Sequence, residues 1–376
     1  MKNTLATLLF IICLSVTHHL LAQTPLEGLP TLHNAKVIAV GESAHGVKDF
    51  TKYKVELFKA LVTKGVTRTL LIETNYSAAS AINDYIRSNQ GSQADSVMKK
   101  GLYGIWAGDD MAELITWMRD YNSSKPTDEQ LSFLGFDAQS AKAATEAIEN
   151  FLKEKNADSH TLLPVNGLTL MKELGVSRTY NIKKLPKEDQ EKIKKSVIAL
   201  RSLVDVHAAQ RPALHLHMRV IEHTLAFEKA NPINFTNIRD ANMAEIVAEQ
   251  LKHESKPVFL WAHNGHINKA RSLWYKPMGY HLSNVLGAAY VAVGLDFRAG
   301  EIRNTYTTGT TRFEPVQDPK WIGKKINQPM QEVTLLHMKD FKGITIRNIG
   351  SGNGMYKTKS DQSFDYMVYF KNVSPM

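Results

Sequence analysis

The chain has 376 residues, of which 43% are hydrophobic and 22% are charged, a balance that excludes a disordered or fibrous protein. This length fits one large α/β domain with an insertion, or two domains. The formal net charge is +9, but there are no basic clusters interleaved with aromatic residues and no helix-turn-helix or zinc-finger spacing, so we expect no nucleic-acid partner.

The first residues have the pattern of a secretory signal. Lys2 precedes an apolar run over residues 5–16, and the segment closes on two leucines and Ala22. That run is too short to span a bilayer as a permanent anchor. We therefore predict a signal peptide over residues 1–23, and a hydrolase domain over residues 24–376 that is periplasmic or secreted in a bacterium and free of the membrane.

The single cysteine, Cys13, lies inside the predicted signal peptide. Ile12 stands before it, where a lipoprotein signal needs a small residue, so we do not expect lipid attachment. The mature chain would then have no cysteine, which excludes a thiol nucleophile and a thiolate metal ligand. It would also lack disulfides, although the predicted compartment permits them.

Four short apolar runs have the pattern of buried β-strands, and ionisable residues follow each of them. Helical patterns separate the first three runs: one over residues 49–63, one around residues 78–86, and a third that Asp109 or Asp110 can cap. Such alternation favours a parallel sheet. The runs and the residues that follow them are 37–40 before Glu42 and His45, 69–72 before Glu73, 133–136 before Asp137, and 258–262 before His263 and His266.

Helical patterns alone occupy the middle of the chain, from about residue 141 to residue 250. We predict a helical insertion there that walls the active-site cleft. The predicted fold class is therefore α/β, with a mostly parallel central sheet flanked by helices and one large helical insertion. A loop-rich stretch is expected over residues 324–354. Strand patterns resume after the insertion at residues 258–263, 290–296, 344–349 and 366–370.

The first strand end carries a glutamate and a histidine in a turn bounded by glycines. In an open parallel sheet the carboxyl ends of the strands face one crevice, where ligands bind. Glu42 and His45 are three residues apart, so the carboxylate can orient the imidazole. The start of the next helix disfavours imidazolium and keeps His45 available as a neutral base. Ser43 lies between them without the Gly-x-Ser-x-Gly pattern of serine hydrolases.

The other strand ends add acids and imidazoles to the same crevice. Glu73 follows a buried strand and can act as a base when ionised or as an acid when protonated. His263 and His266 form a compact pair, of which we expect one to bind the substrate carbonyl and the other to be structural. An aspartate at a strand end is also a common helix cap, and we slightly favour that role for Asp137.

Two other functions fit the same set of acids and histidines at the strand ends. A catalytic zinc would make the protein a metal-dependent hydrolase of another ester or amide, with four candidate ligands. A non-catalytic periplasmic binding protein would use the crevice without chemistry. Four histidines of the predicted insertion lack metal-ligand spacing, and we expect no second metal site at His207, His215, His217 or His223. The candidate zinc ligands are Glu42, His45, Glu73 and His263.

Several motifs together resemble the erythromycin esterase family, and they occur in the family's order. The resemblance extends from about residue 36 to the final strand after Phe364, which is nearly the whole predicted mature chain. The motifs are Gly41-Glu42-Ser43-Ala44-His45-Gly46, Ile72-Glu73, Gly135-Phe136-Asp137-Ala138-Gln139-Ser140, Arg239-Asp240-Ala241-Asn242-Met243-Ala244, Trp261-Ala262-His263-Asn264-Gly265-His266 and Met278-Gly279-Tyr280-His281-Leu282.

This resemblance implies a hydrolase that opens the macrolactone ring of macrolide antibiotics by attack of water on the ester. It implies a small-molecule substrate, no metal or other cofactor, and an α/β core with a large helical portion at the cleft. The family's general base corresponds to His45. Its glutamates correspond to Glu42 and Glu73, and its late histidines to His263 and His266.

Two positions depart from the family's pattern. The family tends to have arginine nine residues after the motif histidine, where this chain has Lys54, which keeps the charge but loses the two-pronged hydrogen-bonding geometry. Before the third helix the family tends to have two tryptophans, and this chain has one, Trp106. We predict that the catalytic residues are His45, Glu42, Glu73 and His263, and that the substrate-binding residues are His266, Lys54, Asp137 and Trp106.

Overall fold

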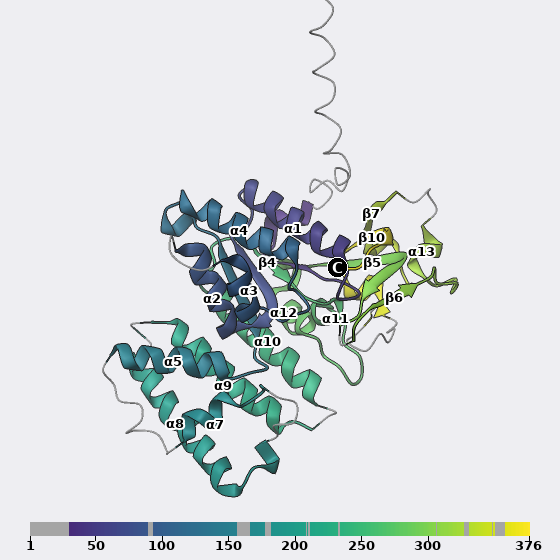
Figure 1. Cartoon of the computed structure of the whole chain (residues 1–376). Coiled ribbons are helices and arrows are strands. Elements are labelled where there is room, and N and C mark those ends of the chain that lie inside the picture. Colours follow the sequence, from purple (N-terminus) through teal and green to yellow (C-terminus); the bar gives the residue numbers. More distant parts are fainter. Residues whose placement is uncertain are drawn as a thin grey trace, which may run out of the picture.

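The computed structural model places one large sheet at the centre of the molecule (Figure 1). It describes residues 30–88, 93–155, 166–176, 182–207, 209, 211–231, 234–305, 307–326, 331–347, 349 and 358–376. The predicted signal peptide over residues 1–23, with Cys13, lies outside the described residues. Among the helices of the described part, none has both the length and the hydropathy needed to cross a bilayer.

The main sheet is mostly parallel, as the sequence predicted. Its strands are β1 (Val37–Val40), β2 (Thr69–Asn75), β3 (Ser132–Asp137), β4 (Val258–Trp261), β5 (Tyr290–Arg303), β6 (Thr310–Phe313), β7 (Val333–His337) and β10 (Tyr366–Val373). Their spatial order is β3-β2-β4-β1-β5-β10-β7, and β6 pairs with the end of β5. Pairing is parallel from β3 to β10, whereas β7 and β6 run antiparallel to their neighbours. The four strands predicted to end on ionisable residues are therefore adjacent.

Alternate residues of the central strands face opposite sides of the sheet. In β1, Val37 and Ala39 belong to one hydrophobic cluster, and Ile38 and Val40 belong to the other. Burial on both faces explains why these strands read as continuous apolar runs. The cluster of Ile38 and Val40 is completed by α1 (Lys48–Thr63), α2 (Tyr76–Arg87), α3 (Ala94–Gly101) and α4 (Asp109–Ser123).

On the opposite face, the hydrophobic cluster of Val37 and Ala39 extends into helices from the middle and later parts of the chain. They are α5 (Lys142–Glu154), α7 (Gly167–Lys172), α8 (Lys187–His207), α9 (Ala213–Lys229), α10 (Phe235–Leu251) and α12 (Met278–Leu286). The described residues between β3 and β4 contain helices and no strand, and α5, α7, α8 and α9 gather beside the sheet while α10 lies closer to it (Figure 1). That this region is an insertion that walls a cleft stays a prediction.

Some elements differ from the sequence predictions. The prediction of a main-sheet strand at residues 344–349 is wrong, because β8 (Thr345–Ile346) pairs with β9 (Thr358–Lys359) in a separate two-stranded sheet. β7 falls in the stretch predicted to be loop-rich, since it is a half-exposed edge strand without a clear apolar pattern. Gly108 precedes α4 in place of an aspartate cap, and both predicted aspartates lie in the first helical turn.

Short α-helices also occur among the described residues. They are α11 (Asn264–Ile267), α13 (Ile322–Lys325) and α14 (Ser360–Ser363). Of these, α11 follows β4 directly, so the histidine-rich motif forms one helical turn at the carboxyl end of a central strand.

Candidate active site

The turn that follows β1 brings Glu42 and His45 to the carboxyl edge of the sheet. Two backbone hydrogen bonds, each 2.9 Å long, fix the turn to β5. Gly46 has a φ of +75°, and a Cβ atom at this position would lie 2.3 Å from the carbonyl oxygen of Arg303. The turn therefore requires glycine there, and its close contact with β5 holds the preceding His45 in place.

Glu42 is a buried carboxylate that accepts hydrogen bonds from two side chains at once. Its Oε1 is 2.7 Å from His45 Nδ1, and its Oε2 accepts from Lys54 Nζ at 2.6 Å. Burial alone would raise the pKa of Glu42, but Lys54 and His45 outweigh that effect and lower it. An ionised Glu42 accepts the Nδ1 proton of His45, which leaves Nε2 as the acceptor nitrogen of the neutral ring.

His45 keeps one ring nitrogen for a ligand. Its Nε2 forms no hydrogen bond or ion pair within the described part of the chain. The side chain is 11% exposed and borders a cavity of about 270 Å³. The centre of its ring lies 4.8 Å from that of His263 and 5.0 Å from that of Trp106, which packs edge-on. The cavity is lined by His45, Gly46, Gly104, Ile105, Arg303, Asn304 and Thr305.

Lys54 lies behind Glu42 and has no exposed side-chain surface. Its ammonium nitrogen is 4.5 Å from the ring centre of Trp261 and 5.7 Å from that of Trp106. Burial lowers the pKa of Lys54 to about 8, although Glu42 opposes the shift. This location differs from the predicted contact with a substrate: Lys54 supports Glu42 from the interior of the protein.

Trp106 is also buried, yet it touches both halves of the site. Its indole Nε1 donates to the backbone oxygen of Glu73 at 2.7 Å, and its ring packs against His45. With 2% of its surface exposed, Trp106 offers almost no area to a substrate and instead packs behind the site. This hydrogen bond fixes the ring beside His45, because a buried indole N–H needs a partner.

A second charged network is centred on Arg239 of α10. Its Nη2 donates to Glu73 Oε1 and to Asp137 Oδ2, both at 2.7 Å. Burial raises the pKa of Glu73, but His266 and Arg239 outweigh it and hold that pKa well below its usual range. Glu73 is therefore an ionised carboxylate and not an acid. The slightly favoured cap role of Asp137 is wrong, because Ala141 precedes α5 and the carboxylate pairs with Arg239.

Both ring nitrogens of His263 are bound to the backbone. Nδ1 accepts from Gly265 N at 3.1 Å, so Nε2 carries the proton and donates to Ile349 O at 2.8 Å. Burial lowers the pKa of His263 to about 3, which keeps the ring neutral. Its backbone N–H donates to Glu73 Oε2 at 3.0 Å. This histidine therefore fits the structural member of the predicted pair and links Glu73 to the ring of His45.

His266 lies between carboxylates. Its Nδ1 is 2.9 Å from Asp240 Oδ1, and its Nε2 is 3.3 Å from Glu73 Oε1. Burial opposes a charge on this ring, but Asp240 and Glu73 outweigh burial and raise the pKa of His266 to about 10. Arg239 Nη1, 3.0 Å from the same Nε2, partly offsets the two carboxylates. His266 is thus a cation at neutral pH, 11% exposed, at the same sheet edge as His45.

The candidate zinc ligands do not form a metal-ligand set in the part of the chain that the structure describes. Within the described ranges, no group of three or more histidine, cysteine, aspartate or glutamate side chains is arranged to hold a metal ion. The zinc hypothesis assigns His263 as a nitrogen ligand, but both its ring nitrogens are hydrogen-bonded to backbone groups. His263 therefore has no free ring nitrogen for a metal in this arrangement.

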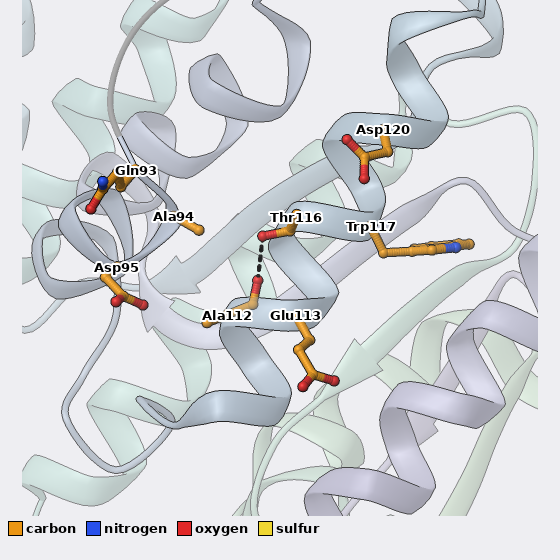
Figure 2. Close-up of a pocket in the computed structure, with 8 residues that line it drawn as sticks. All are labelled: Gln93, Ala94, Asp95, Ala112, Glu113, Thr116, Trp117 and Asp120. Atoms are coloured by element: carbon orange, nitrogen blue, oxygen red, sulfur yellow. Dashed lines mark hydrogen bonds between the residues drawn. The ribbon is translucent and has the colours of Figure 1, made fainter.

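A second and larger cavity, of about 420 Å³, lies between α3 and α4 (Figure 2). Its side chains come from the start of α3 and from one side of α4, and none belongs to either charged network (Figure 2). Size alone does not make this cavity the candidate site. The acidic and basic side chains with shifted pKa values lie at the strand ends instead, and such groups cluster at functional sites. The lining residues are Gln93, Ala94, Asp95, Ala112, Glu113, Thr116, Trp117 and Asp120.

The structure adds residues that the sequence did not single out as site residues. Arg239 and Asp240 belong to a motif of the resemblance, but their position inside a helical pattern gave no reason to place them at the sheet edge. One signal was available: two buried carboxylates, Glu73 and Asp137, at neighbouring strand ends require a cation. Arg303 carries no motif, and its place beside His45 follows only from the tertiary structure.

Comparison with known families identifies the relatives of this chain. A family model described as erythromycin esterase matches residues 63–373. The chain belongs to the erythromycin esterase family. The matched range begins after Glu42 and His45, and it includes Glu73, Arg239 and the late histidines.

Curated proteins are similar to this chain at low identity. Putative hydrolase YbfO of Bacillus subtilis (strain 168) is 25% identical over 358 residues, which cover 83% of this chain and 77% of that protein. Erythromycin esterase type II of Escherichia coli is 22% identical over 316 residues, which cover 74% of this chain and 73% of that protein.

Solved structures share the fold. A Bacillus cereus protein superposes with a TM-score of 0.78 at 18% identity, covering 94% of this chain and 93% of that one. A histidine-to-asparagine mutant of erythromycin esterase EreC in its open conformation has a TM-score of 0.65 at 17% identity, with 92% of both chains covered. This likeness confirms the α/β fold class.

Proposed function

We propose that this family member hydrolyses carboxylic esters by attack of water, with macrolactones as the first substrate class to test. Family membership supports hydrolysis, and the names of the curated relatives support erythromycin as the first substrate. The proposed active centre is the sheet edge where the turn after β1, the end of β2 and the turn after β4 meet.

One observation carries this proposal: His45 has one ring nitrogen fixed by Glu42 and the other without a partner in the described residues, beside a cavity. The other two histidines of the site have both ring nitrogens engaged, His263 with backbone groups and His266 with the carboxylates of Glu73 and Asp240. A histidine that is oriented by a buried carboxylate, lines a cavity and keeps Nε2 as an acceptor has the geometry of a general base.

The proposed reaction begins with a water molecule hydrogen-bonded to His45 Nε2. His45 removes its proton as the water oxygen bonds to the ester carbonyl carbon, and ionised Glu42 stabilises the imidazolium that forms. The carbon–oxygen bond of the ester then breaks, and the leaving alkoxide takes the proton from His45. Arg239 and His266 bring positive charge to the same edge, which would stabilise the developing oxyanion.

This route forms no covalent acyl-enzyme. Ser43 is the nearest hydroxyl in the sequence to His45, but it is fully buried and makes no hydrogen bond to that ring. A serine nucleophile needs a base within hydrogen-bonding reach of its Oγ atom. Water is therefore the nucleophile that the geometry favours.

The test is direct hydrolysis of erythromycin. The purified protein is incubated with erythromycin, with and without a chelator, and mass spectrometry follows the gain of one water. We expect that gain in both samples, and its loss in His45→Ala. His215→Ala changes a half-exposed histidine on α9 and serves as the matched control. Activity that disappears with chelator and returns with metal would instead support a metal-dependent hydrolase.

A further inference from the structure

Arg303 shares the small cavity with His45. This residue ends β5, and its backbone N–H donates to Gly46 O at 3.0 Å, directly beside His45. A Cβ atom on Gly46 would collide with the Arg303 carbonyl, so the two backbones are in close contact. The position of Arg303 relative to the proposed base is thus set by a strand end and a tight turn.

Arg303 is partly buried, and its surroundings differ from those of Arg239 and Arg347. Arg239 is shared between Glu73 and Asp137, and the Arg347 guanidinium donates to two backbone oxygens. The guanidinium of Arg303 has neither an ion pair nor a hydrogen bond with any residue in the described ranges. A guanidinium carries five N–H donors in a planar fork that matches a carboxylate.

The cavity is small and mainly polar. Its volume of about 270 Å³ lies just below the range of pockets that enclose drug-sized ligands, about 300–1,000 Å³. Apart from two glycines and Ile105, its lining consists of His45 and three consecutive polar residues, which are Arg303, Asn304 and Thr305. Such a space fits a short polar group near the reacting ester better than a large apolar ring.

We propose that Arg303 is a specificity-determining residue that binds a free carboxylate on the acyl part of the ester. The preferred substrate class is then the monoester of a short dicarboxylic acid, with its ester carbonyl at His45 and its carboxylate at Arg303. This inference rests on the proposed ester hydrolysis but not on macrolactones as substrates. It concerns binding, so its main effect is on KM.

The test compares three 4-nitrophenyl esters of similar length: the anionic glutarate monoester, the neutral valerate and the cationic 4-aminobutyrate. We expect the wild type to prefer the glutarate monoester. Arg303→Gln should lower kcat/KM for that ester by about 10- to 100-fold, mainly through KM, and leave the valerate within about twofold. Arg303→Lys should retain part of the preference. Arg312→Gln removes an exposed arginine from β6 and is the charge-matched control.

A second measurement separates this inference from the proposed function. Binding of glutarate itself is followed by calorimetry, which needs no turnover. If no ester is cleaved, ester hydrolysis fails, and glutarate binding that is present in the wild type and absent in Arg303→Gln still supports the carboxylate subsite. Equal rates for the anionic and neutral esters, or glutarate binding that is absent or the same in both proteins, would overturn it.

Discussion

At the scale of single residues, the candidate site depends on one buried glutamate with two neighbours. Glu42 is 2% exposed, and it is held ionised by Lys54 on one side while it orients His45 on the other. A buried charge that loses its partner is costly, because neither water nor another group replaces the lost interaction. In the proposed mechanism, the lysine therefore acts through Glu42 and does not contact the substrate.

Removing the charge of Lys54 should damage both stability and activity. Lys54→Met leaves Glu42 with His45 as its remaining partner, so the free energy of unfolding should fall by about 3 kcal/mol. The pKa of Glu42 should rise, and the acid limb of the pH–rate profile should move to higher pH. Lys54→Arg keeps the positive charge and should retain most of both properties. Denaturant unfolding and pH–rate profiles of the wild type, Lys54→Met and Lys54→Arg check this. Equal losses of stability and activity in the two variants would contradict it.

The charge on His266 should make stability depend on pH. Its pKa in the folded protein is raised to about 10 from an ordinary value of 6.5. The stabilisation by Asp240 and Glu73 is therefore complete below pH 6.5, and it is lost as pH rises through about 10. The difference in unfolding free energy between the wild type and His266→Gln should shrink by a few kcal/mol as pH rises from 6.5 to about 10. The reason is that a shift of one pKa unit corresponds to about 1.4 kcal/mol.

Denaturant unfolding of both proteins at pH 6, 8 and 9.5 measures this advantage. Lys54 also titrates in this range, but it is present in both proteins and cancels in the difference. A difference in unfolding free energy that does not change with pH would show that His266 is neutral in the folded protein.

At the scale of elements, α10 is fastened to two strand ends by one guanidinium. Arg239 pairs with Glu73 on β2 and with Asp137 on β3, and both carboxylates are at most 3% exposed. The planar fork of arginine reaches two carboxylates at once, which the single ammonium group of a lysine does less well. These ion pairs join α10 to the candidate site, and so does the contact between Asp240 of the same helix and His266.

Arg239→Met should destabilise the protein by about 3–5 kcal/mol, because two buried carboxylates lose their cation. Arg239→Lys should lose an intermediate amount. The control is Arg219→Met on α9, where a half-exposed arginine pairs with surface glutamates and about 0–1 kcal/mol is expected. Denaturant midpoints of the variants measure these losses. A similar loss of stability in Arg219→Met and Arg239→Met would contradict this role of the Arg239 ion pairs.

The sequence predicted the strand ends well and the partners of their side chains poorly. Strands buried on both faces read as apolar runs, so an acid or histidine at their end marks the edge of a parallel sheet. The contact between Glu42 and His45 follows from their spacing. The pairing of Asp137 with Arg239 joins residues far apart in sequence, and no local pattern encodes it. An exposed edge strand such as β7 lacks the apolar signal altogether.

At the scale of the whole molecule, a doubly covered sheet gathers residues from the entire chain at one edge. The turn after β1, the end of β2, α10 and the turn after β4 each contribute a charged or imidazole group. The family was predictable from ordered motifs, and the fold class from the alternation of strand and helix. The environment of Lys54 was not, because the sequence pattern of α1 does not show that its ammonium group lies beside two tryptophan rings.

In the proposed mechanism His45 Nε2 removes a proton from water, and chemical rescue tests this role most directly. The rate of ester hydrolysis is measured for the wild type and for His45→Ala, with and without added imidazole. We expect kcat/KM to fall by about 10²- to 10⁴-fold in the folded variant, and imidazole to restore part of the rate in proportion to its concentration. A variant that keeps wild-type kcat/KM without imidazole would contradict the claim.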